Sequence, residues 1–315
     1  MTDTMNAATI DAFGPPDVLH VVSVPRPTVG AGEVLIRVYG AGINPVDCKT
    51  RAGGGVAGRL SGFPLILGWD VSGVVEALGP DADGVQVGDE VYGLVRFPQA
   101  GGAYAQYLTA PDDHVAHKPA ALSHREAAAL PLTGLTAWQA LFDVAKVQSG
   151  QRVLVHGAAG GVGHLVAQLA AWAGAAVIGT CSARNAEFAR AAGCDEVIDY
   201  EAAPFEEQIA AVDAVIDCVG GELARRSLDV VRRGGVLVTL PTKVEYNGDA
   251  SSRGIEATWM LVHPDRAQLS KLAELADQGV VRPHIEQSFA LDEVAAAHAR
   301  SETGRVRGKL VIDIA

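Results

Sequence analysis

The stretch 152–170, RVLVHGAAGGVGHLVAQLA, constrains the fold more than any other part of the chain. It begins with the apolar run 153–155, which is typical of a strand buried on both faces. A cluster of glycines occupies 157–163, and apolar residues then recur with helical spacing. Strand, glycine turn and helix in this order predict the phosphate-binding start of a doubly wound nucleotide fold.

The glycines have a physical reason to be there. The chain must turn sharply and bring its backbone close to a pyrophosphate, and the first helical turn then offers N–H groups and a positive dipole end to the anion. The spacing is GxxGGxG rather than GxGxxG, so a plain tight turn is the alternative. Because a strand and a helix flank the cluster, we expect the cofactor to contact Gly157, Ala158, Ala159, Gly160, Gly161, Val162 and Gly163.

The two ends of the chain and its middle have different patterns of predicted secondary structure. Residues up to about Ser123 hold short strand-like runs separated by Gly and Pro, which predicts a small barrel. From His124 strands and helices alternate up to a last strand over Ile255–Val262, which predicts a parallel doubly wound sheet. We expect a helix over Phe289–Ser301 and a closing strand over Lys309–Ile314.

Composition excludes several classes of protein. The 315 residues are 49% hydrophobic and 20% charged, as in an ordinary two-domain enzyme, and the net charge of −12 argues against a nucleic-acid partner. No apolar run is long enough to span a membrane, and the first residues do not have the pattern of a signal peptide. The 4 scattered cysteines fit a reducing compartment, so we expect a cytoplasmic protein.

The cofactor preference is expected at the end of the second strand of the nucleotide fold. An acidic residue there binds the ribose 2′-hydroxyl of NAD, whereas a basic one accepts a 2′-phosphate. The segment 179–184 reads GTCSAR and has no carboxylate. Thr180, Ser182 and Arg184 therefore predict NADPH rather than NADH. The alternative is that Arg184 is a solvated residue at a helix start.

Several further motifs, in a fixed order, carry a resemblance that covers almost the whole chain. They are GINPVD at 42–47, GWDVSG at 68–73, VGDEVYG at 87–93, GGAYA at 101–105, LPLTGLTA at 130–137 and AAGGVG at 158–163. The sequence resembles the zinc-independent quinone oxidoreductases, or zeta-crystallin-like proteins, of the medium-chain dehydrogenase/reductase superfamily. The resemblance implies an α/β protein with a GroES-like β-barrel catalytic domain (1–124 and 265–315) and a Rossmann domain (125–264).

The resemblance also implies an activity. Members bind NADPH in a cleft and transfer hydride to a small-molecule acceptor, a quinone or an α,β-unsaturated carbonyl. They form homodimers in which the last strand of the nucleotide domain, here around Glu256–Leu261, pairs across a two-fold axis. Two alternatives remain open: a non-enzymatic or regulatory NADPH-binding protein, and an enoyl-thioester reductase.

Metal chemistry is not expected. Zinc-dependent relatives use a Cys and a His in the regions that correspond to Asn44 and Trp69, and this chain has neither ligand. The segment 93–102 also lacks the cysteines that hold a structural zinc in those relatives. Without a Lewis acid, reduction of a quinone or enone is more plausible than alcohol oxidation, since hydrogen bonds can stabilise the oxyanion.

Resemblance assigns roles to individual residues of the catalytic domain. Asn44 and Thr133 are expected beside the nicotinamide, where they position it. Asp47 is a third catalytic candidate. It lies with Lys49 one turn further along than Asn44, and the two could form an ion pair at the mouth of the site or a purely structural pair. Tyr104 could donate a proton, although a tyrosine in a strand is more often part of the core.

Cofactor contacts are further expected where strands of the nucleotide domain end, because the carboxyl ends of parallel strands line the ligand crevice. The residues at these positions are Tyr200, Cys218, Val219, Gly220, Leu240 and Pro241. Lys309, from the C-terminal arm, is expected to close the site.

Overall fold

A computed structural model describes residues 4–241 and 247–314 of the chain, with the side chain of residue 247 left out. The chain divides into two compact units. Unit 1 comprises Met1–Leu135 and His263–Ala315, and unit 2 comprises Thr136–Val262. Helix α2 and the start of α3 therefore group with unit 1, although the sequence analysis assigned residues from 125 onward to the nucleotide domain.

Unit 1 is rich in β-structure, as its punctuated sequence predicts. Its larger sheet has the order β15-β16-β3-β5-β6-β8, with β7 pairing β3, and a second sheet has the order β2-β1-β4. The strands are β1 (Thr4–Ile10), β2 (His20–Pro25), β3 (Glu33–Ile43), β4 (Leu65–Ile66), β5 (Asp70–Leu78), β6 (Glu90–Leu94), β7 (Tyr107–Pro111), β8 (Val115–His117), β15 (Ile285–Ala290) and β16 (Lys309–Asp313). The helices are α1 (Pro45–Arg51), α2 (His124–Ala128), α3 (Pro131–Trp138), α8 (Arg266–Asp277) and α9 (Val294–Glu302).

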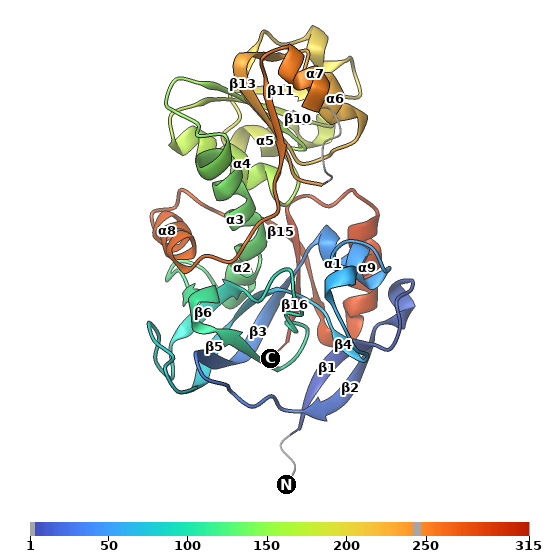
Figure 1. The fold of residues 1–315 in the computed structure, drawn as a ribbon, viewed down its shortest axis with the longest axis vertical. Helices are drawn as coiled ribbons and strands as arrows, with labels where there is room; N and C mark the ends of the chain where they lie inside the picture. The colour runs from blue at the N-terminus through green and yellow to red at the C-terminus, as the bar shows by residue number, and fades with distance from the viewer. Residues whose placement is uncertain (1–3, 242–246, 315) are drawn as a thin grey trace. The chain divides into compact units, whose positions relative to one another are not determined.

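The two ends of the chain build this larger sheet together. Strand β16 pairs antiparallel with β3, and Leu310 lies opposite Ile43. Figure 1 shows the red C-terminal strand β16 beside the blue β3. The pairing brings Lys309, at the start of β16, next to Asn44, which follows β3. Residues more than 260 positions apart in the sequence thus share one site.

The core of unit 1 is built from the strands that the apolar runs predict. Ile36, Val71, Val91 and Ile312 are among its fully buried side chains. Burying a branched aliphatic side chain of this kind contributes about 1.5–3 kcal/mol, so the core holds β3, β5, β6 and β16 in register. The register fixes where each strand ends, and therefore where the polar residues that follow it lie.

One prediction for the C-terminal part is wrong. The expected helix over Phe289–Ser301 begins only at Val294, and Phe289 belongs to strand β15. Strand β15 pairs parallel with β16, with Phe289 opposite Ile312. Phe289 is buried in the core of unit 1, and this packing overrides the helical appearance of the alanine-rich sequence after it.

Unit 2 has the predicted doubly wound sheet. All of its strands are parallel, in the order β11-β10-β9-β12-β13-β14. The strands are β9 (Arg152–His156), β10 (Ala176–Cys181), β11 (Glu196–Asp199), β12 (Val212–Asp217), β13 (Val231–Thr239) and β14 (Glu256–Trp259). The helices are α4 (Gly163–Trp172), α5 (Ala186–Ala191), α6 (Glu222–Ser227) and α7 (Asn247–Ser252), and a π-helical segment covers Gln139–Val144.

The order of the strands positions the ligand site. Strand β9 is central, and the chain runs outward from it first through β10 and β11 and then through β12, β13 and β14. In such sheets ligands bind beyond the carboxyl ends of the strands where the winding reverses. The turn after β9 occupies that position. Among the described residues, no helix is long and apolar enough to cross a membrane.

Candidate functional site

The glycine turn has the close backbone packing that its sequence predicts. Gly157 has a φ of +69°, a conformation that favours glycine. A Cβ atom on Gly163 would lie 2.1 Å from the carbonyl oxygen of Gly157 and 2.8 Å from its carbonyl carbon. The same atom on Gly160 would meet its nearest described neighbour, the Gly157 oxygen, at 3.3 Å. Gly163 is therefore required by packing, whereas Gly160 has more room.

This turn fits a dinucleotide phosphate. Helix α4 begins at Gly163, so the turn leads directly to a helix N-terminus with its outward N–H groups. The neighbouring strand β10 leaves room for the turn because its residue 179 is a glycine. A Cβ atom on Gly179 would lie 2.8 Å from the Ala158 Cβ and 2.5 Å from the Cys194 sulfur. Bare backbone thus lies where a pyrophosphate has to come close.

A buried network that the sequence analysis missed fixes the start of the turn. His156, the last residue of β9, is within 2.9 Å of the Ser227 hydroxyl through Nε2 and within 3.1 Å of the Thr180 hydroxyl through Nδ1. The Thr180 oxygen accepts the Gly157 N–H at 3.4 Å. Burial lowers the pKa of His156 to about 3, so its ring is neutral. Thr180, expected at the cofactor, is buried and already engaged in this network.

The other cofactor candidates of unit 2 follow the same edge of the sheet. Ser182 directly follows β10 and is buried, whereas Arg184 is exposed in the short turn Ala183–Asn185. Tyr200, just after β11, is 56% exposed. These positions leave an exposed cation and an exposed aromatic ring at the ends of two adjacent strands.

Asp217, a residue without a role in the sequence analysis, shapes the next part of this edge. Its carboxylate accepts the N–H groups of Val219 and Gly220, each at 2.9 Å. The Thr239 hydroxyl also donates to it, at 3.2 Å. Asp217 thereby fixes the turn that contains Cys218, Val219 and Gly220. Its backbone oxygen accepts the N–H of Leu240, which precedes Pro241 at the end of the next strand.

Unit 1 holds a second group of predicted residues, centred on Asn44. Asn44 is fully buried and precedes helix α1, and its backbone N–H donates to Asp47 Oδ2 at 2.5 Å. Its side chain does not cap the helix. Instead, Nδ2 donates to Asp70 Oδ2 at 2.9 Å, and Oδ1 accepts a hydrogen bond from Lys309 Nζ. The structure thus places Asn44 between a carboxylate and an ammonium group.

Lys309 and Asp70 complete this group. Lys309 Nζ also donates to the Ile43 carbonyl oxygen at 2.7 Å and lies 3.6 Å from Asp70 Oδ2. Asp70 Oδ1 accepts the N–H of Leu132, at the start of α3, at 2.7 Å. Burial lowers the pKa of Lys309 and raises that of Asp70, and each charge opposes the shift of the other. The sequence analysis quoted Asp70 in a motif but gave it no role.

Thr133, also expected beside the nicotinamide, is buried in helix α3 one residue after Leu132. Its hydroxyl donates back to the Ala129 carbonyl oxygen at 2.9 Å. Because Asp70 holds the first turn of α3, Thr133 belongs to the same rigid surroundings as Asn44.

Asp47 does not pair with Lys49, so that part of the sequence analysis is wrong. Lys49 is exposed, whereas Asp47 is fully buried, and the cation that acts on Asp47 is Lys309. Burial raises the pKa of Asp47 to about 7, and Asp70 adds to the effect, while the Asn44 N–H, Lys309 and Tyr104 oppose it. The Oδ1 atom of Asp47 is buried without a hydrogen-bond partner.

Tyr104, which the sequence analysis considered as a proton donor or a core residue, lies beside Asp47, and His298 lies next to Tyr104. The Tyr104 hydroxyl is fully buried and interacts with Asp47, and it lies 3.2 Å from His298 Nε2. Burial lowers the pKa of His298 to about 3, and its Nδ1 has no hydrogen-bond partner. A polar line of three residues thus runs through the interior of unit 1. Sequence spacing carries no signal for it.

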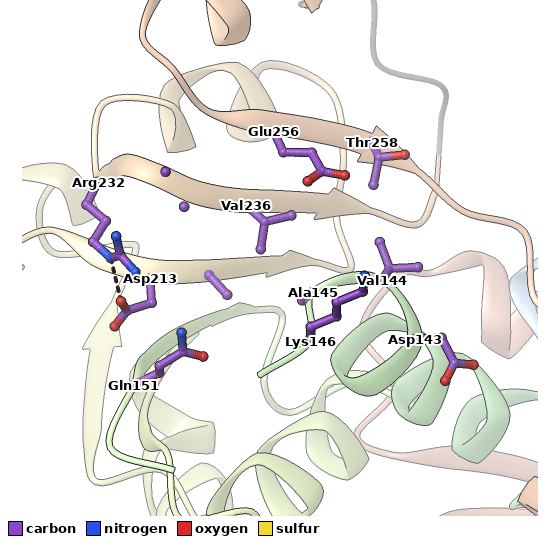
Figure 2. A pocket seen from close by; sticks show the side chains of 13 residues that line it. Asp143, Val144, Ala145, Lys146, Gln151, Asp213, Arg232, Val236, Glu256 and Thr258 are labelled. Atoms are coloured by element: carbon purple, nitrogen blue, oxygen red, sulfur yellow. Dashed lines mark hydrogen bonds and ion pairs between the residues drawn. The ribbon is translucent and has the colours of Figure 1, made fainter. Parts of the chain in front are cut away.

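Unit 2 also has a surface pocket at the edge of its sheet opposite the glycine turn (Figure 2). Its volume is about 380 Å³, and it is lined by residues at the amino ends of the strands, such as Gln151, Asp213 and Glu256. Asp213 forms an ion pair with Arg232 there, at 2.5 Å. Within the described ranges, no group of three or more His, Cys, Asp and Glu side chains is arranged to hold a metal ion.

Comparison with known proteins finds dehydrogenase domain families and oxidoreductases that are similar to this chain. Residues 30–120 match the alcohol dehydrogenase GroES-like domain, and residues 192–312 match a family described as zinc-binding dehydrogenase. The chain is 35% identical to the mouse mitochondrial NAD(P)H oxidoreductase RTN4IP1, over 98% of this chain and 89% of that protein. It is 37% identical to 2-methylene-furan-3-one reductase of Solanum lycopersicum, over 98% and 79%. The structure of the quinone oxidoreductase from Coxiella burnetii matches it with a TM-score of 0.94 and 41% identity, over 99% and 100% of the two chains.

Proposed function

Since this chain belongs to the medium-chain dehydrogenase/reductase superfamily, in its quinone oxidoreductase branch, we propose that it is an NADPH-dependent reductase of quinones or α,β-unsaturated carbonyls. The observation that carries the proposal is the glycine turn between β9 and α4, at the reversal point of the sheet. Oxidoreductase activity is common to the relatives, and the name of the RTN4IP1 relative specifies NAD(P)H.

In this proposal unit 2 holds the dinucleotide. The backbone of Gly157 to Gly163 cradles the pyrophosphate, and the Ser182 hydroxyl and Arg184 bind the 2′-phosphate. Tyr200 covers the adenosine, and the turn fixed by Asp217 presents Cys218, Val219 and Gly220. Bound NADPH supplies the hydride.

Unit 1 supplies the environment of the reacting carbon. Asn44 and Thr133 orient the nicotinamide and the acceptor, and their burial keeps water away from the reacting atoms. The acceptor's carbonyl oxygen gains negative charge as hydride adds to carbon, and a fixed donor lowers the barrier for this step. We assign Asn44, Thr133 and Asp47 to this region, with Lys309 behind them.

The acceptor class is supported by the names of two relatives, a quinone oxidoreductase and a reductase of a conjugated furanone. An enoyl-thioester reductase is the second candidate, because the CurK enoyl reductase has the same fold with a TM-score of 0.89. A binding protein without turnover is the third.

The test is oxidation of NADPH, and of NADH in parallel, with an ortho-quinone, a para-quinone, a 2-enal and a 2-enoyl thioester, with and without EDTA. We expect turnover with NADPH on a quinone or the enal, at a rate that EDTA leaves unchanged. Turnover on the thioester alone assigns the second candidate. Tight NADPH binding without turnover on any acceptor contradicts a reductase and leaves the binding protein.

A further inference from the structure

The orientation of the Asn44 side chain is fixed by its neighbours. An ammonium group can only donate hydrogen bonds, so the Asn44 atom that contacts Lys309 has to be the amide oxygen. The amide nitrogen then faces Asp70, where it donates to Oδ2 at 2.9 Å. The opposite orientation would set two donors against each other on one side of the amide and two acceptors on the other.

One donor of this amide remains for a ligand. The nitrogen carries two hydrogens, and among the described residues the structure supplies it with one acceptor, Asp70. Hydrogen bonds in a chain polarise each other, and a charged donor on the oxygen withdraws electron density from the nitrogen. The remaining N–H of Asn44 is therefore a stronger donor than the N–H of an isolated amide.

Lys309 is fully engaged by the protein. Its ammonium group donates hydrogen bonds to the Ile43 carbonyl oxygen and to Asn44 Oδ1, and it forms an ion pair with Asp70, whose Oδ2 lies 3.6 Å away. The side chain is 3% exposed, and the register of β16 against β3 holds its backbone in place. A direct contact between its ammonium group and the dinucleotide would require one of these bonds to break.

We propose that Lys309 is a positioning residue, which aims and polarises the Asn44 Nδ2–H toward the carbonyl oxygen of the acceptor. The inference rests on the proposed function and adds a role for the buried ion pair. When hydride adds to carbon, the π electrons move onto the carbonyl oxygen, and the anion that forms accepts this hydrogen bond and later takes a proton from solvent. The two electrons and the hydrogen come from the dinucleotide.

A developing anion suits this donor better than a neutral hydroxyl does. Hydrogen bonds to charged groups are roughly twice as strong as those between neutral groups, and the surroundings of Asn44 exclude water. The effect of Lys309 should therefore appear in the rate of hydride transfer rather than in the affinity for NADPH.

A double-mutant cycle tests this role. The variants are Asn44→Ala, Lys309→Met and the two combined, each measured by single-turnover hydride transfer and by NADPH fluorescence titration. Removal of one donor to an oxyanion lowers the rate by about 100- to 1,000-fold, so we expect a loss of this order in each single variant. We expect no further loss in the combined variant, because Lys309 acts through Asn44. The Kd for NADPH should stay within about threefold in Lys309→Met, because the ammonium group does not contact the dinucleotide.

Two further variants separate this role from folding. Lys309→Met leaves Asp70 as a buried unpaired carboxylate, which can destabilise the fold. The double variant Lys309→Met with Asp70→Asn removes both charges together, and its rate of hydride transfer should fall as far as that of Lys309→Met alone. Lys118→Met is the matched control, because Lys118 is also a nearly buried lysine, 6% exposed, bonded to the Pro119 and Leu122 carbonyl oxygens and to Glu90. It should lose thermal stability and keep its rate. Additive losses in the cycle, or a tenfold rise in the Kd for NADPH without a rate loss, would overturn the proposal.

A readout without turnover distinguishes this inference from the proposed function. We expect 4-nitrophenol bound to the NADP⁺ complex to ionise at lower pH than free 4-nitrophenol, since its phenolate oxygen resembles the developing anion. The shift should disappear in Asn44→Ala and in Lys309→Met. If the wild type shifts the ionisation but reduces no acceptor, the proposed function fails and the donor remains. If the wild type reduces acceptors without any shift, the donor assignment is wrong.

Discussion

Gly163→Ala should destabilise unit 2 because its new methyl group has nowhere to go. The Cβ would lie 2.1 Å from the Gly157 oxygen, 2.8 Å from its carbonyl carbon and 3.0 Å from the Ala158 Cα, and all three are backbone atoms. Backbone at the centre of the sheet cannot rotate away as the end of a flexible side chain can. The turn must therefore open, with β9 and α4 separating slightly.

The magnitude follows from two opposing terms. Overpacking of this kind costs about 3 kcal/mol, at the upper end of its usual range, since the contact is more than 1 Å too short. Alanine at the start of α4 recovers at most about 1 kcal/mol through its better helix propensity. The net loss of about 2 kcal/mol should lower the Tm by roughly 4 °C or more for a chain of this size.

Gly160→Ala is the matched control in the same turn. Its Cβ would meet its nearest described neighbour at 3.3 Å, so the change in Tm should be below about 2 °C. Scanning calorimetry measures both variants, and NADPH titration follows. Gly160→Ala should weaken NADPH binding while the fold is kept, because the methyl group faces the phosphates, and Gly160→Asp should abolish binding. Equal Tm values for Gly163→Ala and the wild type would refute the steric argument.

The remaining predictions concern titrating groups and cofactor choice. Burial raises the pKa of Asp47 to about 7 in the folded protein, so folding binds a proton and stability should fall as the pH rises from about 4 to about 7. Asp47→Asn should weaken this dependence in urea melts at a series of pH values; an unchanged slope would contradict a raised pKa. His156→Ala should lower the free energy of unfolding by about 2–3 kcal/mol, because it takes one hydrogen-bond partner from each of the buried Thr180 and Ser227 hydroxyls. In the control His117→Ala, the side chain is 64% exposed, so the free energy of unfolding should hardly change. Arg184→Ala should raise the KM for NADPH about tenfold and leave that for NADH almost unchanged, and equal effects on both would show that Arg184 does not read the 2′-phosphate.

The nucleotide fold could be predicted from local sequence because its signals are local. The apolar run before Gly157, the glycines and the helical pattern after them are contiguous, and each element has one dominant reason for its conformation. The boundaries were less certain. Phe289 belongs to a strand because of its place in a distant core, and no pattern within its own segment carries that information.

The interior of unit 1 could be predicted only in part. Asn44 and Lys309 were found through family motifs, but their contact depends on the pairing of β3 with β16. Asp70 had no predicted role, and Tyr104 could not be assigned to the site or to the core, because buried polar and buried apolar side chains can occupy similar sequence patterns. The pairing of Asp47 with Lys49 failed because helical spacing does not report which side chain points inward.

The pairing of β3 with β16 also sets an order of events during synthesis. A ribosome completes β3 before unit 2, but β16, which joins β3 and carries Lys309, is synthesised only after unit 2. Unit 2 lies between them and has all of its strands available before that point, so it can fold while unit 1 still lacks one strand of its larger sheet. Asn44 acquires its ammonium neighbour only after residue 309 has been synthesised and β16 has paired with β3. A nascent or prematurely terminated chain can therefore hold a finished nucleotide fold without the polar cluster around Asn44.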